Sequence, residues 1–211
     1  MKTPLAVIGL VGEKCAGKDT VQKLLVEELL KSQGVLQYCF WERCTFAHLR
    51  FSDILVETLK NWRIPVTREN LQKLPVAMRP AYGNDVLANV VKARVLESKA
   101  NFVILGGIRW KDSDLPVLRS FPNNFLIYVT ASVEIRFERE KIRKQQADKR
   151  TAYEGEGESF GQFLREEKAV NEIEIPEIGK MADFKIDNSG TFDDLRLQIR
   201  QFITEKLRIR L

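Results

Sequence analysis

The chain has 211 residues, of which 44% are hydrophobic, 30% charged and 9% aromatic, a composition typical of one globular domain with a full core. Its net charge of +5 is too small to imply dedicated nucleic-acid binding. Three cysteines are too few for a disulfide framework, and a single histidine argues against Ser–His–Asp catalysis and histidine-based metal sites. No apolar run approaches the ~18 residues of a membrane span. We therefore expect neither nucleic acid nor a membrane as a partner.

Residues 5–11 form a continuous apolar run that predicts a strand covered on both faces. A secretory signal peptide is the alternative, but charged residues follow the run at once and no small-residue cleavage site ends it. We therefore expect a cytoplasmic protein. A loop over residues 12–17 then leads into a helix over residues 19–32, where apolar residues recur at helical spacing.

The rest of the chain alternates between strand and helix signals, which implies a parallel sheet covered on both faces. Apolar runs predict strands within residues 37–47, 102–105, 125–129 and 184–186. A helix is expected over residues 83–98, and helix-start residues precede the other helical patterns at Ser52, Thr67, Ser132, Ser159 and Thr191. The stretch over residues 148–158 is polar and rich in glycine, which predicts a mobile loop.

The most specific motif lies between the first strand and the first helix. Its Gly-x4-Gly-Lys spacing is that of a loop whose backbone N–H groups, together with the helix N-terminus, surround phosphate oxygens while the lysine reaches the terminal phosphates. A glycine-rich turn without function is the alternative, but the strand–loop–helix setting disfavours it. The residues expected to bind ATP here are Gly12, Glu13, Lys14, Cys15, Ala16, Gly17, Lys18, Asp19 and Thr20.

One position departs from the usual form of this motif. Asp19 follows Lys18 where a serine or threonine hydroxyl normally binds magnesium, and Thr20 comes one residue later. A carboxylate also binds Mg²⁺. The sequence therefore leaves Asp19 and Thr20 as alternative metal ligands.

The Gly-Lys-Asp-Thr form of the motif resembles phage-type deoxynucleoside monophosphate kinases and related small-molecule P-loop kinases. Residues 48–53, 107–109, 136–139 and 188–190 resemble, in order and spacing, segments of nucleoside monophosphate kinase-like and dephospho-CoA kinase-like proteins. The resemblance covers nearly the whole chain. It implies one three-layer α/β P-loop NTPase domain with a parallel sheet of about five strands, a helical acceptor-side region near residues 50–98 and a lid near residues 136–171.

The resemblance also implies a reaction, the transfer of the γ-phosphoryl group of ATP, with Mg²⁺, to a small phosphate-bearing acceptor. A nucleoside or deoxynucleoside monophosphate is the first choice of acceptor, and dephospho-CoA is the second. The residues expected to take part in catalysis are Lys18, Asp53, Arg109, Arg136, Arg139 and Arg143. The residues expected to bind the acceptor are Arg50, Asp53, Arg79 and Arg109, and those expected beside the base of ATP are Asn188 and Gly190.

Each of these residues also has a purely structural interpretation. Asp53 would complement a helix dipole, and the arginines at positions 50, 79 and 109 would be surface residues. The arginines at positions 136, 139 and 143 share one helix face, which by default is solvated. A metal set of Cys15, Cys39, Cys44 and His48 matches no common zinc spacing, so we expect ordinary thiols there.

A second departure bears on catalysis. Relatives of this type usually carry an aspartate directly before the Gly-Ile-Arg stretch, where this chain has Gly106. Asp112 and Asp114 lie just downstream as candidate substitutes. The alternative function, from another class, is a nucleotide-binding switch or scaffold with little catalysis. The oligomeric state is left open.

Overall fold

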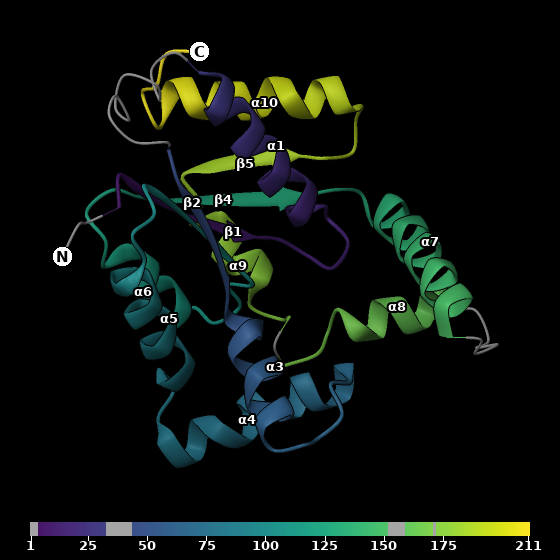
Figure 1. Ribbon diagram of the computed structural model, residues 1–211. Helices are drawn as coiled ribbons and strands as arrows, with labels where there is room; N and C mark the ends of the chain where they lie inside the picture. Colours follow the sequence, from purple (N-terminus) through teal and green to yellow (C-terminus); the bar gives the residue numbers. More distant parts are fainter. Residues whose placement is uncertain (1–3, 33–43, 152–158, 171) are drawn as a thin grey trace.

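The computed structural model describes residues 4–32, 44–151, 159–170 and 172–211 (Figure 1). Five parallel strands form one sheet in the order β2-β3-β1-β4-β5. Their bounds are Ala6–Val11 for β1, Phe46–Arg50 for β2, Phe102–Gly106 for β3, Asn124–Thr130 for β4 and Phe184–Asp187 for β5. The α/β class and the five-stranded parallel sheet are thus confirmed.

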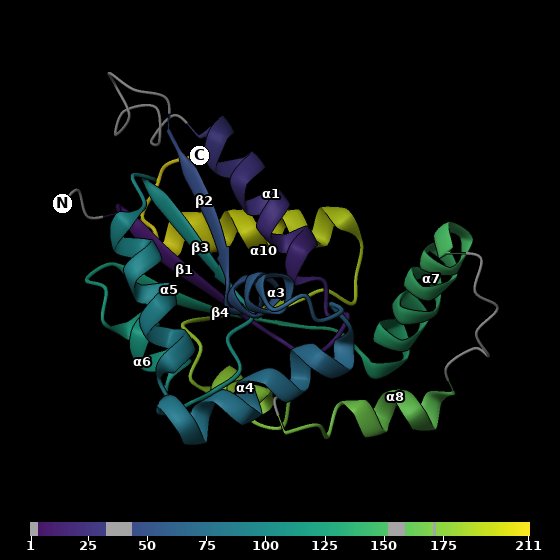
Figure 2. The same cartoon turned by 60° about the horizontal axis from the view of Figure 1, so that its bottom comes forward.

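Helices cover both faces of the sheet and so form three layers (Figures 1 and 2). One core joins the sheet to α1 (Lys18–Lys31) and α10 (Phe192–Glu205). The other core joins it to α3 (Phe51–Asn61), α4 (Arg68–Tyr82), α5 (Val86–Glu97), α6 (Asp114–Arg119) and α9 (Ile175–Lys180). The remaining helices, α7 (Val133–Thr151) and α8 (Phe160–Glu166), extend past the carboxyl ends of the strands.

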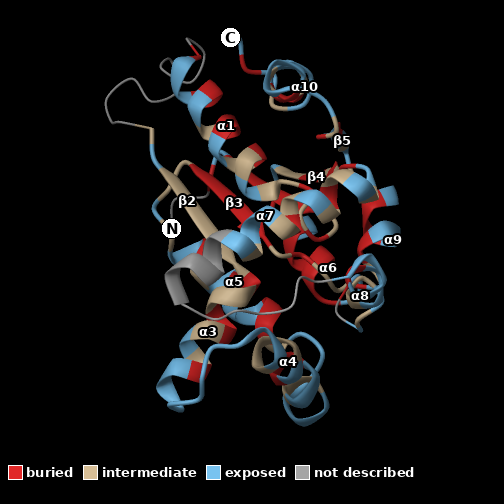
Figure 3. Ribbon diagram, turned by 90° about the vertical axis from the view of Figure 1, so that its right-hand side faces the viewer, coloured by how far each residue is buried: buried red, intermediate tan, exposed pale blue. Residues whose placement is uncertain are grey.

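The sequence of strand β1 does not alternate between apolar and polar residues, because both faces of the strand are buried. All six of its residues are buried, with Val7 and Val11 in one core and Ala6, Ile8 and Leu10 in the other. Strand β3 beside it is also buried throughout (Figure 3). A central strand of a parallel sheet is apolar on both faces because helices exclude water from each side.

The strand register brings the candidate site together. Gly106, the last residue of β3, pairs with Leu10 of β1 on one side and with Arg50 of β2 on the other. Because parallel strands point the same way, the segments that follow β1, β2 and β3 begin at one edge of the sheet, where α/β proteins bind ligands. No helix in the described part of the chain is long and apolar enough to cross a membrane.

Several predicted boundaries differ from the structure. Strand β2 begins at Phe46, so only the end of the expected strand within residues 37–47 is seen, and residues 33–43 lie outside the described residues. Helix α7 runs past its expected end near residue 146, and residues 152–158 of the expected mobile loop also lie outside. Helix α3 starts at Phe51 rather than after a Ser52 cap, because Asp53 caps it by accepting from the Arg50 amide. The short helices α6 and α9 were not predicted.

Candidate functional site

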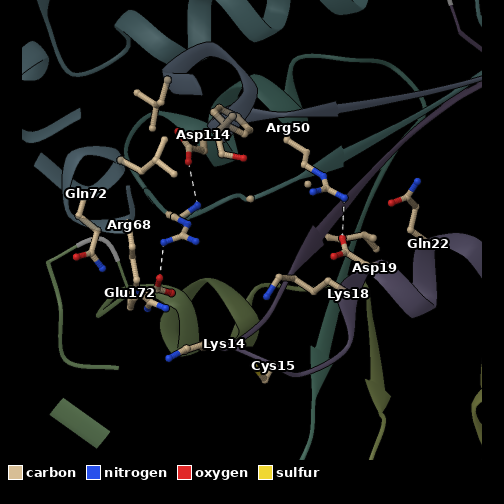
Figure 4. A pocket seen from close by; sticks show the side chains of 18 of the residues that line it. Lys14, Cys15, Lys18, Asp19, Gln22, Arg50, Arg68, Gln72, Asp114 and Glu172 are labelled. Carbon is tan, nitrogen blue, oxygen red and sulfur yellow. Dashed lines mark hydrogen bonds and ion pairs between the residues drawn. The ribbon is translucent and has the colours of Figure 1, made fainter. Parts of the chain in front are cut away.

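A pocket of about 520 Å³ lies at the carboxyl ends of β1, β2 and β3 (Figure 4). Its walls come from the loop after β1, the starts of α1 and α3, helix α4, the segment after β3, and helix α7. Seven cationic side chains line it, against three carboxylates from Asp19, Asp114 and Glu172. The cations are Lys14, Lys18, Arg50, Arg68, Arg109, Arg139 and Arg143. This excess of positive charge suits a ligand that carries several phosphate charges.

Two glycines of the loop after β1 are required by its geometry. A Cβ atom on Gly12 would lie 2.1 Å from the carbonyl oxygen of Val129 in β4. Gly17 has φ of +96° and forms the N-cap of α1, and a Cβ atom there would lie 2.1 Å from Nδ2 of Asn188. That amide of Asn188 is buried and donates to the carbonyl oxygen of Ala16 at 2.8 Å. The backbone therefore passes close to its neighbours where the motif has glycine.

Lys18 folds back onto the loop that precedes it. Its Nζ donates to the carbonyl oxygens of Gly12 at 2.6 Å and of Glu13 at 2.9 Å. Burial, and next the positive charge of Arg109, lower the pKa of Lys18 to about 8. An anionic ligand beside this amine would favour its protonated form.

The middle of the loop is tied to the helices that follow β4. Lys14 is buried, and its ammonium forms ion pairs at 2.8 Å with Glu140 of α7 and with Glu166 of α8. The thiol of Cys15 donates to Glu140 at 3.1 Å, and burial together with this carboxylate raises the pKa of Cys15 to about 11. Burial alone would raise the pKa of Glu140, but hydrogen bonds from Lys14 and Cys15 outweigh it and hold that pKa at about 2. The cysteine is therefore a neutral donor at pH 7.

Glu13 is tied to the sheet. The hydroxyl of Tyr128 in β4 donates to its carboxylate. Burial, and then this bond, raise the pKa of Tyr128 to about 12. Tyr128 thus holds the start of the loop while Lys14 and Cys15 hold its middle.

The three arginines of α7 do not share one environment. Arg139 donates to the carbonyl oxygens of Cys15 at 3.3 Å, Ala16 at 3.4 Å and Asn188 at 2.8 Å, so it braces the loop after β1 from the side of α7. Arg143 lines the pocket, is 61% exposed, and pairs with Glu140 at 2.6 Å. The alternative that these arginines form a solvated helix face is therefore wrong for Arg139, whose guanidinium contacts backbone carbonyl oxygens.

Arg136 differs from the other two because it is buried and does not line the pocket. Its guanidinium donates to the carbonyl oxygen of Ala131 at 3.0 Å and forms an ion pair with Glu167 after α8. Arg136 was expected to contact phosphate. In the structure its guanidinium instead links α7 to the end of α8.

The candidate magnesium ligands lie in the first turn of α1. The carboxylate of Asp19 is 72% exposed and pairs with Arg50 at 2.9 Å, while Thr20 also lines the pocket. Among the described residues no group of three or more histidine, cysteine, aspartate or glutamate side chains could hold a metal ion. Mg²⁺ usually takes only one or two protein carboxylates and completes its shell with waters and substrate phosphates. One carboxylate and one hydroxyl beside Lys18 therefore fit a magnesium ion that arrives with a nucleotide.

The structure explains the glycine at position 106. A Cβ atom there would lie 3.1 Å from Nε2 of His48 and 3.4 Å from Cγ of Arg50. The imidazole of His48 thus fills the space beside the strand end, and burial, with the charge of Arg50 next, lowers its pKa. A side chain at position 106 would therefore require the imidazole of His48 to shift by a few tenths of an ångström.

Neither candidate substitute for the missing aspartate takes its position. Asp112 forms two bonds with Arg79, at 2.8 and 2.9 Å, outside the pocket lining. Asp114 does line the pocket, but it accepts from the amides of Arg109 at 2.9 Å and Trp110 at 3.1 Å and so holds the segment after β3. Burial raises the pKa of Asp114 to about 6 despite these bonds.

Three other expected site residues have structural roles. Arg79 stacks 4.1 Å above the ring of Trp110 and is occupied by Asp112, so it does not reach the pocket. Asp53 caps α3 and does not line the pocket. Gly190 lies against the Asp194 cap of α10, where a Cβ atom would meet that carboxylate at 2.8 Å.

Among the charged residues that line the pocket, two were not expected from the sequence, Arg68 and Glu172. Arg68 pairs with Glu166 at 3.1 Å, and Glu172 pairs with Arg109. Arg68 is the first residue of α4, where a cation opposes the helix dipole, and this mismatch was the available signal. Nothing in the sequence marks Glu172.

The chain was compared with known proteins. No family model matches it. A UPF0200/UPF0201 protein from Archaeoglobus fulgidus is 28% identical over 206 residues, which cover 96% of this chain and 56% of that protein. The chain thus spans little more than half the length of that relative. A UPF0200 protein from Methanoregula boonei is 25% identical over 198 residues, which cover 93% of this chain and 95% of that protein.

Two solved structures share the fold. TT1252 from Thermus thermophilus has a TM-score of 0.58 and 16% identity, over 97% of this chain and 98% of that one. Shikimate kinase from Acinetobacter baumannii, in complex with shikimate, has a TM-score of 0.52 and 19% identity, over 98% of this chain and 94% of that one. At these identities the likeness is one of fold. The chain therefore has the three-layer α/β fold found in small P-loop kinases such as shikimate kinase.

Proposed function

We propose that the protein is a phosphotransferase that moves the γ-phosphoryl group of ATP to a nucleotide-type acceptor, with a nucleoside or deoxynucleoside monophosphate as the first choice. The observation that carries this proposal is the glycine-containing loop between β1 and α1, which borders a pocket lined by seven cations, two of them from the loop motif itself. The fold shared with shikimate kinase supports small-molecule phosphoryl transfer in general. The choice of a nucleotide acceptor rests on the sequence resemblance and on the pocket.

The charge pattern favours a phosphate acceptor over a hydroxyl acceptor such as dephospho-CoA. A hydroxyl nucleophile needs a general base within hydrogen-bond reach, whereas a phosphate oxygen is already anionic. Each lining carboxylate is engaged, Asp19 by Arg50, Glu172 by Arg109, and Asp114 by backbone amides. The apolar part of the lining, Leu55, Leu71, Pro75 and Leu87, leaves a surface against which a base can pack.

In the proposed reaction, the bond from the γ-phosphorus to the β-phosphate oxygen breaks and a bond to an acceptor phosphate oxygen forms, which yields ADP and a nucleoside diphosphate. Little covalent chemistry is asked of the protein, because positioning and charge neutralisation supply most of the rate. Lys18 would leave the loop carbonyls for the terminal phosphates, while Arg109 and Arg143 neutralise charge on the transferred group. Mg²⁺, held by Asp19 or Thr20, would neutralise charge on the β- and γ-phosphates. Closure of the lid, residues 136–171, would exclude water.

The second candidate is a switch or scaffold that binds ATP with little catalysis. The observation in its favour is His48, which fills the space where related kinases place a carboxylate beside the strand end.

The deciding experiment incubates the protein with ATP, Mg²⁺ and a panel of acceptors, and measures ADP release. The panel holds nucleoside and deoxynucleoside monophosphates, dephospho-CoA and shikimate, and Lys18→Ala serves as the inactive control. Turnover that depends on a monophosphate supports the proposal, and turnover with dephospho-CoA alone selects the alternative acceptor. Nucleotide binding without acceptor-dependent turnover would select the switch.

A further inference from the structure

Three cations that line the pocket are paired with two carboxylates from one short part of the chain, residues 166–172. Glu166 ends α8 and contacts both Lys14 of the phosphate loop, at 2.8 Å, and Arg68 of α4, at 3.1 Å. Glu172, in the turn before α9, pairs with Arg109 after β3. We call Glu166 and Glu172 the internal counter-ions. They meet side chains from three elements that are far apart in the sequence.

Glu172 and Arg109 form an ion pair, and the backbone of each residue is held by hydrogen bonds. The amide of Glu172 donates to the carbonyl oxygen of Ala169 at 2.8 Å, and its own carbonyl accepts from Ile175 at 3.2 Å. The amide of Arg109 donates to the buried carboxylate of Asp114 at 2.9 Å. Only 8% of the Glu172 side chain is exposed, against 37% for Arg109. The carboxylate therefore lies on the buried side of the pair, while the guanidinium faces the pocket.

Chemically, a carboxylate on a guanidinium occupies the position that a phosphate would take, because both anions accept the same paired N–H bonds. In Figure 4, Glu172 and Arg68 lie at one end of the pocket, Asp19 and Arg50 at the other, and Lys18 between them. The end with Glu172 is bordered by α4, on the acceptor side of the fold, whereas Asp19 belongs to the phosphate loop.

We propose that Glu172, supported by Glu166, is an autoinhibitory latch on the acceptor-phosphate subsite, which an incoming phosphate must displace from Arg109. The assignment of this subsite to an acceptor rests on the proposed function, but the latch itself concerns anion binding alone. Displacement breaks the Glu172–Arg109 pair and leaves the guanidinium to the phosphate, while Glu166 keeps its own pairs with Lys14 and Arg68. Weakly bound anions are kept out, because their binding must first break the internal pair.

The size of the effect follows from competition. If the internal pair is formed nine tenths of the time, only one tenth of the molecules are competent to bind, and the affinity for any anion at Arg109 is about tenfold lower than without the latch. Glu172→Gln keeps the shape of the side chain and removes its charge. Its affinity for a phosphate anion at this subsite should therefore rise by up to about tenfold.

The experiment titrates wild type and Glu172→Gln with inorganic phosphate, followed by nuclear magnetic resonance, and titrates both with ADP separately. Phosphate affinity should rise up to about tenfold in the variant, with ADP affinity changed less than twofold. The matched control is Glu177→Gln, which removes a carboxylate of α9 that pairs with Lys111 at 3.0 Å outside the pocket lining. It should leave phosphate affinity unchanged.

Unchanged phosphate affinity in a folded Glu172→Gln protein overturns the latch. If that variant does not fold, Glu172→Asp is the test. Its carboxylate keeps the charge but lies one methylene farther from Arg109, so phosphate affinity should rise by less than in Glu172→Gln. Unchanged affinity in Glu172→Asp then overturns the proposal. The proposed function is judged separately, by turnover in the acceptor panel, so a phosphate effect without any turnover supports the latch and counts against the kinase.

Discussion

Glu140 is the carboxylate whose removal tests the link between the phosphate loop and α7. Its side chain is fully buried and contacts Lys14, Cys15 and Arg143. Glu140→Gln preserves the volume and removes the charge, so Lys14 loses one of its ion-pair partners and keeps its pair with Glu166. We expect a folded protein of clearly lower stability.

The pKa of Glu140 gives the magnitude. It falls from an ordinary value of 4.5 to about 2, which corresponds to roughly 3 kcal/mol of stability, since one pKa unit is worth about 1.4 kcal/mol. At about 2–4 °C per kcal/mol for a chain of this size, the melting temperature should drop by about 6–12 °C. Because the folded pKa is depressed, this stability is complete above pH 4.5 and is lost as the pH falls towards 2. The difference between wild type and variant should shrink over the same range.

Urea denaturation of both proteins at pH 7, and again at several values between pH 5 and pH 3, measures this directly. The matched control is Glu138→Gln, which removes a carboxylate of the same helix that is 62% exposed and pairs with Lys141. It should cost less than about 0.5 kcal/mol. A loss below about 1 kcal/mol in Glu140→Gln at pH 7, or a difference that does not change with pH, would refute the argument that buried charge pairing stabilises this joint.

Three further predictions concern the phosphate loop. Affinity for ADP should fall above about pH 8, because the pKa of Lys18 is about 8 in the free protein and its charge is lost there; calorimetry of wild type and Lys18→Arg measures this. Gly17→Ala should abolish nucleotide binding and lower stability by at least about 1 kcal/mol, because φ is +96° and the new Cβ meets Asn188, as thermal melts with and without ADP will show. Asp19→Ala should raise the Mg²⁺ concentration needed for half-maximal turnover more than Thr20→Ala, if the carboxylate is the metal ligand.

These predictions have clear contrary outcomes. A fall in ADP affinity with pH that persists in Lys18→Arg would assign the titration to another group. Normal ADP binding by Gly17→Ala would mean that the loop can adopt a different path. Equal effects of the two magnesium variants, or a larger effect at Thr20, would overturn the assignment of the metal to Asp19.

The sequence by itself determined the fold class and predicted that the loop between β1 and α1 binds phosphate. The apolar run of β1, Gly17 with its φ of +96° and the Thr191 cap of α10 are local patterns, because hydrophobic patterning, positive φ and capping depend on residues close in the chain. The strand ends also placed Arg50 and Arg109 at one edge of the sheet, since parallel strands have a common direction.

Only the tertiary structure decided what each charged residue contacts. Arg136, Arg139 and Arg143 have equivalent spacing on one helix face, yet the first is buried against Glu167, the second braces the phosphate loop and the third faces the pocket. Arg79 and Arg68 belong to one helix, and only Arg68 reaches the pocket. An ion pair forms wherever the fold brings opposite charges together, at any sequence separation, so a pattern read along the chain gives the positions of the charges but not their partners.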